Sequence, residues 1–308
     1  MSKPIPKNLP ASIRQRLLDL AKERKDDFGL ILVKYGLERI LYRLSRSAYR
    51  EVFVLKGALL FELWTQDTYR PTRDADFLGR GDNAPERLVR IFRELTAMEV
   101  EPDGLIFDSK SVQAQRITKD EDHNGVRVTF TATLDKARIP VQIDIGFGDT
   151  VTPAPVESDY PTFLAAPAPR LFVYPKETVV AEKFEAIVSL GIANTRMKDF
   201  YDLEVLSRRF RFKGEILKEA IDKTFANRRT ELPETGIPLA FTIEFYDNQA
   251  KKKQWTAFST KNGPAVKTPE LKTVVEVLKI FLAPIAIAAR ENKSFGQEWE
   301  PGGPWRSK

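Results

Sequence analysis

Apolar side chains return every three or four positions through long stretches of this chain, which is the period of an amphipathic helix. Between residues 11 and 48 leucine and isoleucine follow this spacing, and we expect helices there. The same period predicts a helix over 84–98. It then dominates the second half of the chain, where helices are expected over 176–190, 199–210, 214–228 and 268–290.

Apolar and polar residues alternate with period two between residues 126 and 148. The runs "VRVTFTATL" (126–134) and "IPVQIDIGFG" (139–148) each place apolar side chains on one face, and "DKAR" between them is typical of a hairpin turn. Two shorter runs predict buried strands: "VFVLKG" (52–57), which ends in a glycine turn before a buried helix, and "RDADFLG" (73–79). A small mixed sheet with helices is therefore expected over 51–150.

These patterns predict an α+β protein with two lobes. Basic helices over 1–50 are expected to pack on the sheet lobe over 51–150. The Pro-rich stretch over 151–170 is typical of a linker, and residues 171–308 are expected to form a mainly helical second lobe.

The residue types that are missing narrow the chemistry. The 308 residues include no cysteine, which excludes disulfides, zinc–thiolate sites and cysteine nucleophiles. The one histidine, His123, lies in the turn-like "KDEDHNGVR" and is interpreted as a solvated loop residue. Catalysis would then depend on carboxylates, Lys and Arg, an inventory that suits Mg²⁺ and phosphates.

The distribution of apolar residues also bears on location. No apolar run reaches the ~18 residues that a membrane helix needs, and the N-terminal segment has no apolar core of the signal-peptide type. We expect a cytoplasmic protein with no membrane partner.

Positive charge is concentrated in two places on a chain of formal net charge +6. Residues 1–50 hold twelve Lys and Arg against five Asp and Glu, and "RRFRFK" (208–213) interleaves cations with phenylalanines. Such clusters are typical of solvated helix faces, but they also attract nucleic acid. The candidate RNA-binding residues are Arg39, Arg43, Arg46, Arg208, Arg209 and Arg211.

Asp74 and Asp76 lie two positions apart in a predicted strand, so they share one face of the sheet. Asp144 lies on the non-apolar face of another predicted strand. Three carboxylates on one face could hold one or two divalent cations that bridge a nucleotide's phosphates. A D-x-D alone is a weak signal, because it is often solvated or paired with an arginine such as the adjacent Arg73. Glycosyltransferases use the same motif.

Gly57-Ala58 closes one predicted strand and opens a helix. Backbone N–H groups at such a point form an anion site, and Lys56 would add positive charge there. A plain tight turn is the alternative interpretation.

Charged side chains also gather around the end of the helix predicted over 176–190. Lys183 lies at the edge of its apolar stripe, where its stem could cover apolar surface or its ammonium could reach a triphosphate. Arg196, Lys198 and Asp199 stand at the start of the next helix. They are either part of a nucleotide site or an ordinary charged helix start, since the helix dipole favours an acid such as Asp199 there.

Five segments, in order along residues 11–290, resemble successive motifs of the AbiEii/AbiGii toxin family of nucleotidyltransferases, also called MenT-like toxins. They are "ERILYRLSRSAYREVFVLKGALLFELW", "RPTRDADFLG", "VQIDIGFGD", "YPKETVVAEKFEAI" and "TRMKDFYDL". The resemblance implies a polymerase-β-like nucleotidyltransferase lobe fused to a helical lobe. It also implies Mg²⁺, with Mn²⁺ as a substitute, nucleoside triphosphates as substrates, and a toxin whose antitoxin is encoded nearby. Such pairs are linked to abortive phage infection, and some members add nucleotides to tRNA 3′ ends.

The resemblance assigns roles residue by residue. Asp74 and Asp76 match the metal-binding pair, Lys183 the phosphate-contacting lysine and Asp199 the acid of the following motif. Asp144 matches the third strand acid of the wider superfamily, and with the first pair it makes the expected metal set.

The family pattern is broken at Gly57-Ala58, which stands where the superfamily has Gly-Ser and lies further ahead of the acidic pair. The expected nucleotide contacts are Lys56, Gly57, Ala58, Lys183, Arg196 and Lys198. The expected function is transfer of nucleotides to RNA. Transfer to a protein or small molecule, and a non-catalytic module that binds RNA or protein, are the alternatives.

Overall fold

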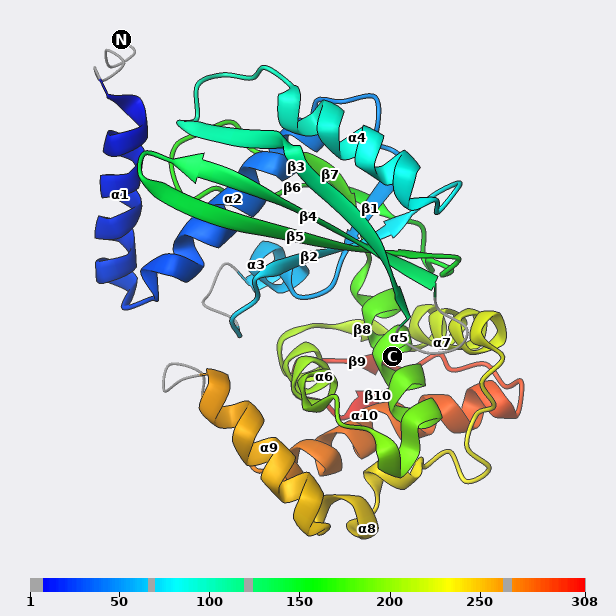
Figure 1. The fold of residues 1–308 in the computed structure, drawn as a ribbon. Coiled ribbons are helices and arrows are strands. Elements are labelled where there is room, and N and C mark those ends of the chain that lie inside the picture. The colour runs from blue at the N-terminus through cyan, green and yellow to red at the C-terminus, as the bar shows by residue number, and fades with distance from the viewer. Residues whose placement is uncertain (1–7, 66–69, 119–123, 263–267, 308) are drawn as a thin grey trace. The chain divides into compact units, whose positions relative to one another are not determined.

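The computed structural model describes residues 8–65, 70–118, 124–262 and 268–307 (Figure 1). His123 lies outside the described residues. The chain divides into two compact units. Residues 1–148 and 156–173 form a sheet unit, and residues 149–155 and 174–308 form a helical unit. The predicted α+β class, with a mixed sheet and a mainly helical C-terminal part, is confirmed.

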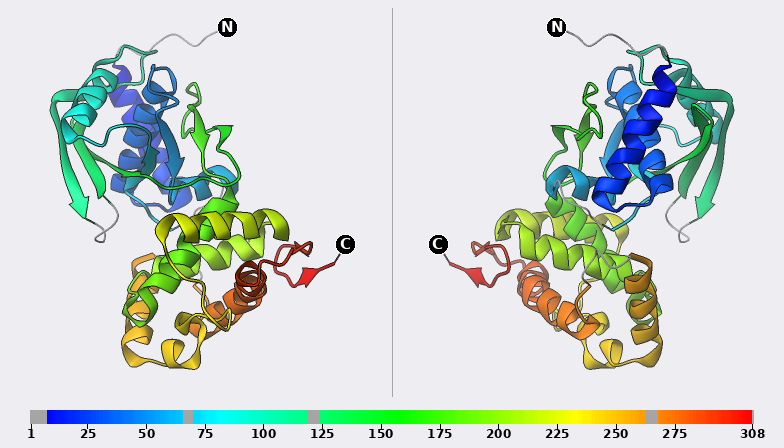
Figure 2. Two further views of the ribbon diagram at one scale, coloured as in Figure 1. Left: turned by 90° about the vertical axis from the view of Figure 1, so that its right-hand side faces the viewer. Right: turned by 90° about the vertical axis from the view of Figure 1, so that its left-hand side faces the viewer.

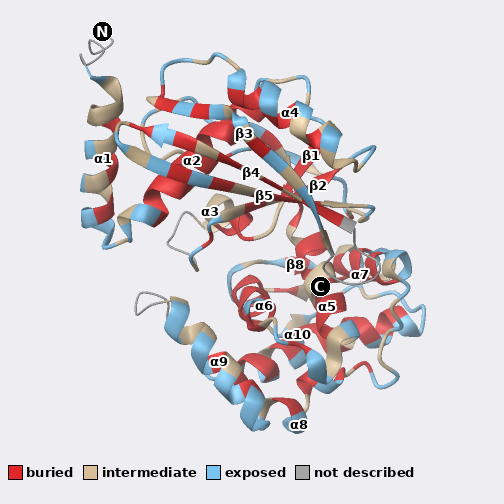
Figure 3. Ribbon diagram, viewed as in Figure 1, coloured by how far each residue is buried: buried red, intermediate tan, exposed pale blue. Residues whose placement is uncertain are grey.

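Two capped helices begin the sheet unit. They are α1 (Leu9–Arg24) and α2 (Phe28–Ser45), and the side chains of Asn8 and Asp27 accept hydrogen bonds from the first-turn N–H groups of each. Nearly every residue of α2 is buried (Figure 3). Gly36 brings α2 close to the sheet, because a β-carbon there would lie 3.2 Å from the Ile139 side chain.

Seven strands form one mixed sheet, in the order β3-β4-β5-β2-β1-β7-β6. Strand β2 runs parallel to β5 and β1 runs parallel to β7, while the other neighbours are antiparallel. The predicted hairpin is confirmed, since Leu134 of β4 pairs with Ala137 of β5. The strands are β1 (Phe53–Lys56), β2 (Asp74–Gly79), β3 (Leu105–Thr118), β4 (Asn124–Leu134), β5 (Ala137–Phe147), β6 (Val156–Asp159) and β7 (Arg170–Val173).

The segment predicted as a linker over 151–170 lies partly inside this sheet. Strands β6 and β7 pair with each other, and Val54 of β1 pairs with Phe172 of β7. Leu171 and Val173 are fully buried. The prolines that suggested a boundary occupy the turns around these short strands, so the composition concealed two strands of the sheet unit.

One face of the sheet is apolar and is covered by two helices. Helix α4 (Pro85–Ala97) packs Phe92 against Phe53 and Phe130, with ring centroids 5.8 and 6.2 Å away. Helices α2 and α4 contact each other on this face (Figure 2). The short helix α3 (Leu59–Thr65) follows β1. Because side chains alternate along a strand, the residues between these apolar positions point to the opposite face.

The helical unit contains the predicted helices, with ends within three residues of those expected. Helix α9 and a small sheet of three short strands were not predicted from the sequence. The helices are α5 (Lys176–Leu190), α6 (Met197–Arg209), α7 (Gly214–Arg228), α8 (Ile243–Tyr246), α9 (Gln249–Asn262) and α10 (Leu271–Arg290), with 3₁₀ turns η1 (Gly191–Ala193) and η2 (Leu239–Phe241). The strands are β8 (Phe212–Lys213), β9 (Glu298–Trp299) and β10 (Trp305–Arg306).

Aromatic rings hold the C-terminal strands in place. Phe281 of α10 lies 4.7 Å from Trp299 and 5.9 Å from Trp305, measured between ring centroids. The indole N–H of Trp299 donates to the Ser207 carbonyl at the end of α6. The C-terminal residues are therefore anchored by burial of large rings.

Candidate active site

Four strands of the sheet unit contribute one row of charged residues. Asp76 of β2 and Asp144 of β5 are register partners on neighbouring parallel strands. Lys56 of β1 pairs with Asp76 on one side, and Arg127 of β4 pairs with Asp144 on the other. The row therefore reads positive, negative, negative, positive across the sheet. It lies on the face opposite the one that α2 and α4 cover, since Phe77 beside Asp76 points into the buried core.

A second polar row lies beside the first. Asp74 of β2 pairs with Gln142 of β5, which in turn pairs with Thr129 of β4. The buried hydroxyl of Thr72 donates to Oδ1 of Asp74 at 2.7 Å. Asp74 and Asp76 thus share a face, as the sequence predicted, and Thr72 orients the first of them.

Arg127 binds the third acid of the predicted site through a two-pronged contact. Its Nε donates to Oδ1 of Asp144 and its Nη2 to Oδ2, both at 2.8 Å. The amide of Gln142 lies 3.5 Å from Oδ1. Asp144 is buried, while the Arg127 side chain is 32% exposed.

The carboxylates of Asp144, Asp74 and Asp76 together stabilise the positive charge of Arg127. Hydrogen bonding to Asp144 raises the pKa of the Arg127 guanidinium above its ordinary value; burial opposes this rise, and the charges of Asp144, Asp74 and Asp76 add to it. Sequence reasoning missed Arg127. The signal was present, because the predicted hairpin through "DKAR" places residue 127 opposite residue 144.

Gly57 packs directly against the carboxylate of Asp76. It has a φ of +76°, and a β-carbon there would stand 2.1 Å from Oδ2 of Asp76. Any other residue would displace the carboxylate. The expected phosphate contacts of Lys56, Gly57 and Ala58 stay predictions.

The Asp74–Asp76 pair fits a metal-bound nucleotide better than a cage built by protein alone. Mg²⁺ is commonly held by one or two carboxylates together with substrate phosphates and water. Within the described ranges, no three Asp, Glu, His or Cys side chains come together in a way that could hold a metal ion. The structure therefore does not assemble the predicted three-acid ligand set. Asp144 instead directs both of its oxygens to Arg127.

The helical unit brings together a second set of predicted site residues. The ammonium of Lys183 on α5 lies 2.6 Å from Asp199 and 2.7 Å from Asp202, both fully buried on α6. Arg196 adds a contact to Asp199 at 2.6 Å. Burial would raise the pKa of Asp199, but the charges of Lys183 and Arg196 outweigh this and hold it below its ordinary value. Lys198 is exposed.

The pairing of Lys183 with acids has a local sequence origin. Asp199 and Asp202 are three residues apart and therefore share one face of α6. Sequence reasoning selected Lys183, Arg196 and Asp199 for a site, and these residues do lie together. A phosphate contact by Lys183 stays a prediction.

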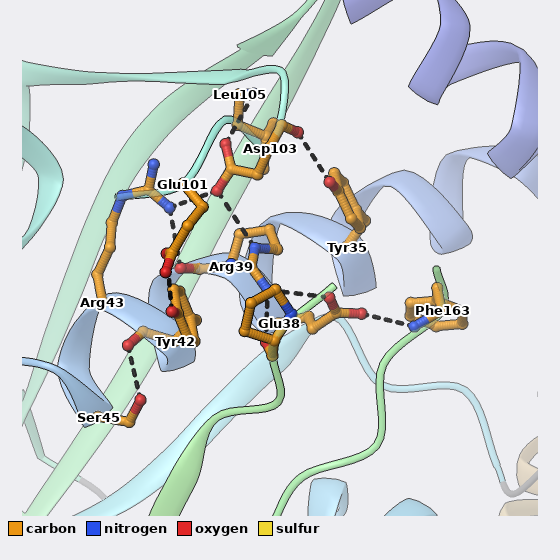
Figure 4. Close-up of polar contacts among 11 residues, drawn as sticks. Tyr35, Glu38, Arg39, Tyr42, Arg43, Ser45, Glu101, Asp103, Leu105 and Phe163 are labelled. Carbon is orange, nitrogen blue, oxygen red and sulfur yellow. Dashed lines mark hydrogen bonds and ion pairs between the residues drawn. The ribbon is translucent and has the colours of Figure 1, made fainter. Parts of the chain in front are cut away.

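Two of the arginines expected to bind RNA are interior residues, so this part of the prediction is wrong (Figure 4). Arg39 and Arg43 both donate to Oδ2 of Asp103, at 3.2 and 2.7 Å, and neither side chain reaches solvent appreciably. Arg39 also donates to the Pro167 carbonyl at 3.1 Å. These two arginines of α2 face inward because Asp103, from the segment before β3, supplies the compensating charge.

The other candidate RNA contacts are exposed. Arg46 lies on the surface after α2, and Arg208, Arg209 and Arg211 lie around the end of α6. Arg208 is paired with Glu204 and Arg211 with Glu300. The neighbouring acids reduce the local positive charge, and contact with RNA stays a prediction for these residues.

Comparison with known families gives the class of protein, a nucleotidyltransferase. The model of one family, described as the nucleotidyl transferase AbiEii toxin of a type IV toxin–antitoxin system, matches residues 39–277. The chain belongs to this family.

Two solved structures from Helicobacter pylori are similar to this chain. One is JHP933, at 14% identity and a TM-score of 0.43, with 87% of this chain and 94% of that chain covered. The other is a candidate nucleotidyltransferase, at 14% identity and a TM-score of 0.45, with 87% and 96% covered. No curated protein matches the sequence. None of the helices within the described ranges has both the length and the hydropathy needed to cross a bilayer.

Proposed function

We propose that this family member is a Mg²⁺-dependent enzyme that transfers nucleotides from a nucleoside triphosphate to an RNA 3′ end, with tRNA as the acceptor. The observation that supports this most is the pair of carboxylates on one face of β2, with Asp144 in register beside them. Blocking of tRNA ends would stop translation and growth, which agrees with the toxin family. The antitoxin is the expected partner.

The proposed reaction is a single displacement at phosphorus. The oxygen of the acceptor hydroxyl forms a bond to the α-phosphorus of the triphosphate. The bond from that phosphorus to the oxygen shared with the β-phosphate breaks, pyrophosphate leaves with the electron pair, and the hydroxyl proton passes to water or to a nearby carboxylate. Positioning and charge stabilisation carry most of the catalysis in such a transfer.

The residues of the sheet unit have distinct tasks in this proposal. Asp74 and Asp76 would hold Mg²⁺, which neutralises charge on the triphosphate when bound. Thr72 orients Asp74 through its hydrogen bond, and Gly57 leaves the space in which the Asp76 carboxylate lies. Asp144 is held by Arg127 next to Asp76.

The helical unit holds a candidate phosphate contact of its own, the ammonium of Lys183. Two buried acids hold the ammonium of Lys183 in one orientation, which lowers the entropy that it would lose on contacting a phosphate oxygen. Arg196 and Lys198 are the further candidate phosphate contacts. Arg46, Arg208, Arg209 and Arg211 are the exposed arginines available to the RNA backbone.

Labelling with each of the four nucleoside triphosphates, carrying ³²P at the α-phosphate, tests the function directly. The protein is incubated with Mg²⁺ and either total RNA, purified tRNA or total protein, and pyrophosphate release is measured in parallel. We expect label in tRNA, and Asp76→Asn should abolish it. Asp159→Asn, an exposed acid on the outer strand β6, is the matched control and should label normally.

The alternatives give different results in the same assay. Label in protein with none in RNA would favour modification of a protein. Binding of nucleotide or RNA without pyrophosphate release would favour a non-catalytic module. Full nucleotide transfer by the Asp76→Asn protein would show that the proposed site does not carry the activity.

A further inference from the structure

Arg127 binds the carboxylate of Asp144, the acid that was predicted as the third metal ligand. Both oxygens of Asp144 accept hydrogen bonds from the guanidinium, at 2.8 Å each. A guanidinium stays charged at every physiological pH, so this positive charge is permanent. Asp144 is buried, whereas Asp74 and Asp76 are partly exposed on β2.

The row of charges shows how the repulsion between the acids is offset. Asp76 and Asp144 are register partners on adjacent strands. The backbones of adjacent strands lie about 5 Å apart. Arg127 compensates Asp144 from β4 through two hydrogen bonds, and Lys56 of β1 is the register partner of Asp76. The protein therefore supplies its own cation on the Asp144 side.

Two-metal sites place their ions about 4 Å apart, and a carboxylate between them bridges both. For Asp144 to bridge two metal ions, its carboxylate would have to release the Arg127 guanidinium. Otherwise, the second divalent cation would have to bind directly beside the positive charge of Arg127. Like charges repel strongly in a partly buried site. Asp74, by contrast, accepts its hydrogen bond from the neutral hydroxyl of Thr72, which does not repel a cation.

We propose, building on the function above, that Arg127 replaces a second metal ion. The site then takes one divalent cation, at Asp74 and Asp76 together with the nucleotide's phosphates. Arg127 is a positioning residue that holds Asp144 beside this ion. Asp144 is not a metal ligand.

Manganese can be counted per chain without any turnover. The full-length protein is dialysed to equilibrium against Mn²⁺ with the α,β-methylene analogue of each nucleoside triphosphate, and manganese and nucleotide are measured on the protein side. The wild-type protein should bind one manganese for each analogue. Asp76→Asn should bind none. Arg127→Gln, which removes the charge and keeps a polar side chain, should bind two.

Two further variants separate the charge of Arg127 from its packing. Arg127→Lys keeps a cation and should bind one manganese. The double variant Arg127→Gln/Asp144→Asn removes both partners and should return to one, because the carboxylate needed for a second ion is gone. If Arg127 had only a structural role, the number of bound manganese ions would not rise in Arg127→Gln and return to one in the other two variants.

Other outcomes overturn the inference. Two manganese ions in the wild-type protein would do so, as would one ion in a well-folded Arg127→Gln protein. If Arg127→Gln fails to fold, the wild-type count still decides between one ion and two.

The number of bound manganese ions, read together with the nucleotide-transfer assay, separates a failure of this inference from a failure of the proposed function. One manganese per chain without nucleotide transfer would refute the proposed function alone. Two ions with transfer would refute the one-ion inference alone, and no manganese in the wild-type protein would refute both.

Discussion

Gly57 and Asp76 are in such close contact that a β-carbon on the glycine would stand 2.1 Å from the carboxylate oxygen Oδ2. Gly57 also has a φ of +76°, a conformation that side chains with a β-carbon rarely adopt. Glycine is thus required twice, once by the backbone and once by the space next to a proposed metal ligand. The turn before α3 and the acidic pair of β2 form one structural feature.

Gly57→Ala should therefore lose both stability and nucleotide transfer. The matched control is Gly148→Ala, since Gly148 has a φ of +85° but no atom outside its two chain neighbours lies within 4 Å of the place that a β-carbon would take. The control should lose about 1–2 kcal/mol from backbone strain alone. Gly57→Ala should lose more, and the excess measures the collision with Asp76. Hydrogen exchange of the sheet unit in urea gives the stability, and equal losses in the two variants would contradict this explanation.

Asp103→Asn should strongly destabilise the sheet unit. Asp103 accepts hydrogen bonds from both Arg39 and Arg43. Its loss takes this counter-charge from two buried guanidinium groups and leaves Arg39 with only the Glu38 carboxylate, 3.5 Å away. Breaking a buried ion pair in this way costs about 3–5 kcal/mol. Glu99→Gln, at an exposed acid of the segment between α4 and β3, should change stability little. Urea unfolding followed by hydrogen exchange checks both variants, and an unchanged Asp103→Asn protein would contradict the interior role of these arginines.

Glu38 should make the stability of the sheet unit depend on pH. Burial raises its pKa from 4.5 to about 7, although hydrogen bonding from the Phe163 N–H and the charge of Arg39 oppose the rise. The folded state therefore holds a proton that the unfolded chain releases, so stability is highest below pH 4.5 and falls as the pH rises to about 7. At about 1.4 kcal/mol for each pH unit, the loss is on the order of 3 kcal/mol.

Glu38→Gln removes this titration, because the amide resembles the protonated acid. Its stability should change less than that of the wild-type protein between pH 4.5 and 7. Urea unfolding at several pH values in this range measures the difference. Parallel profiles for the two proteins would show that Glu38 does not titrate in this way.

Lys183→Met should destabilise the helical unit and reverse part of its pH dependence. In the wild-type protein the pKa of Asp199 is lowered, so its contribution to stability is present above pH 3.8 and is lost on acidification. Without the ammonium, Asp199 and Asp202 become buried acids with too little positive charge, at a cost of about 3–5 kcal/mol near neutral pH. Protonation should then restore stability as the pH falls.

The control for this variant is Lys198→Met, at an exposed position on the neighbouring helix α6. It should leave both the stability and its pH dependence close to those of the wild-type protein. Thermal unfolding at pH 5 and pH 7.5 compares the three proteins. A Lys183→Met protein whose stability does not rise, relative to that of the wild-type protein, between pH 7.5 and pH 5 would contradict the pairing.

Much of the fold could be predicted from the sequence because it depends on local patterns. Period two marked β4 and β5, the "DKAR" turn set their register, and helical spacing marked the main helices. The face shared by Asp74 and Asp76 follows from the same period. Strand β3 was missed, because it is an edge strand with a largely polar sequence. Strands β6 and β7 were missed, because they are four residues long and lie in the sheet through the pairing of β7 with the distant β1.

By itself, the sequence determined the kinds of residues available and the faces that local periodicity gives them. It determined that carboxylates would face one way on β2, and it offered Lys183 near acids that share one face of α6. Only the tertiary structure decided which charges meet. Arg39 and Arg43 look like surface arginines until Asp103 is placed against them, and Asp144 looks like a metal ligand until Arg127 closes on both its oxygens. The physical reason is that periodicity acts between neighbours in the chain, whereas the energy of a charge depends on its burial and on partners that folding brings from far away.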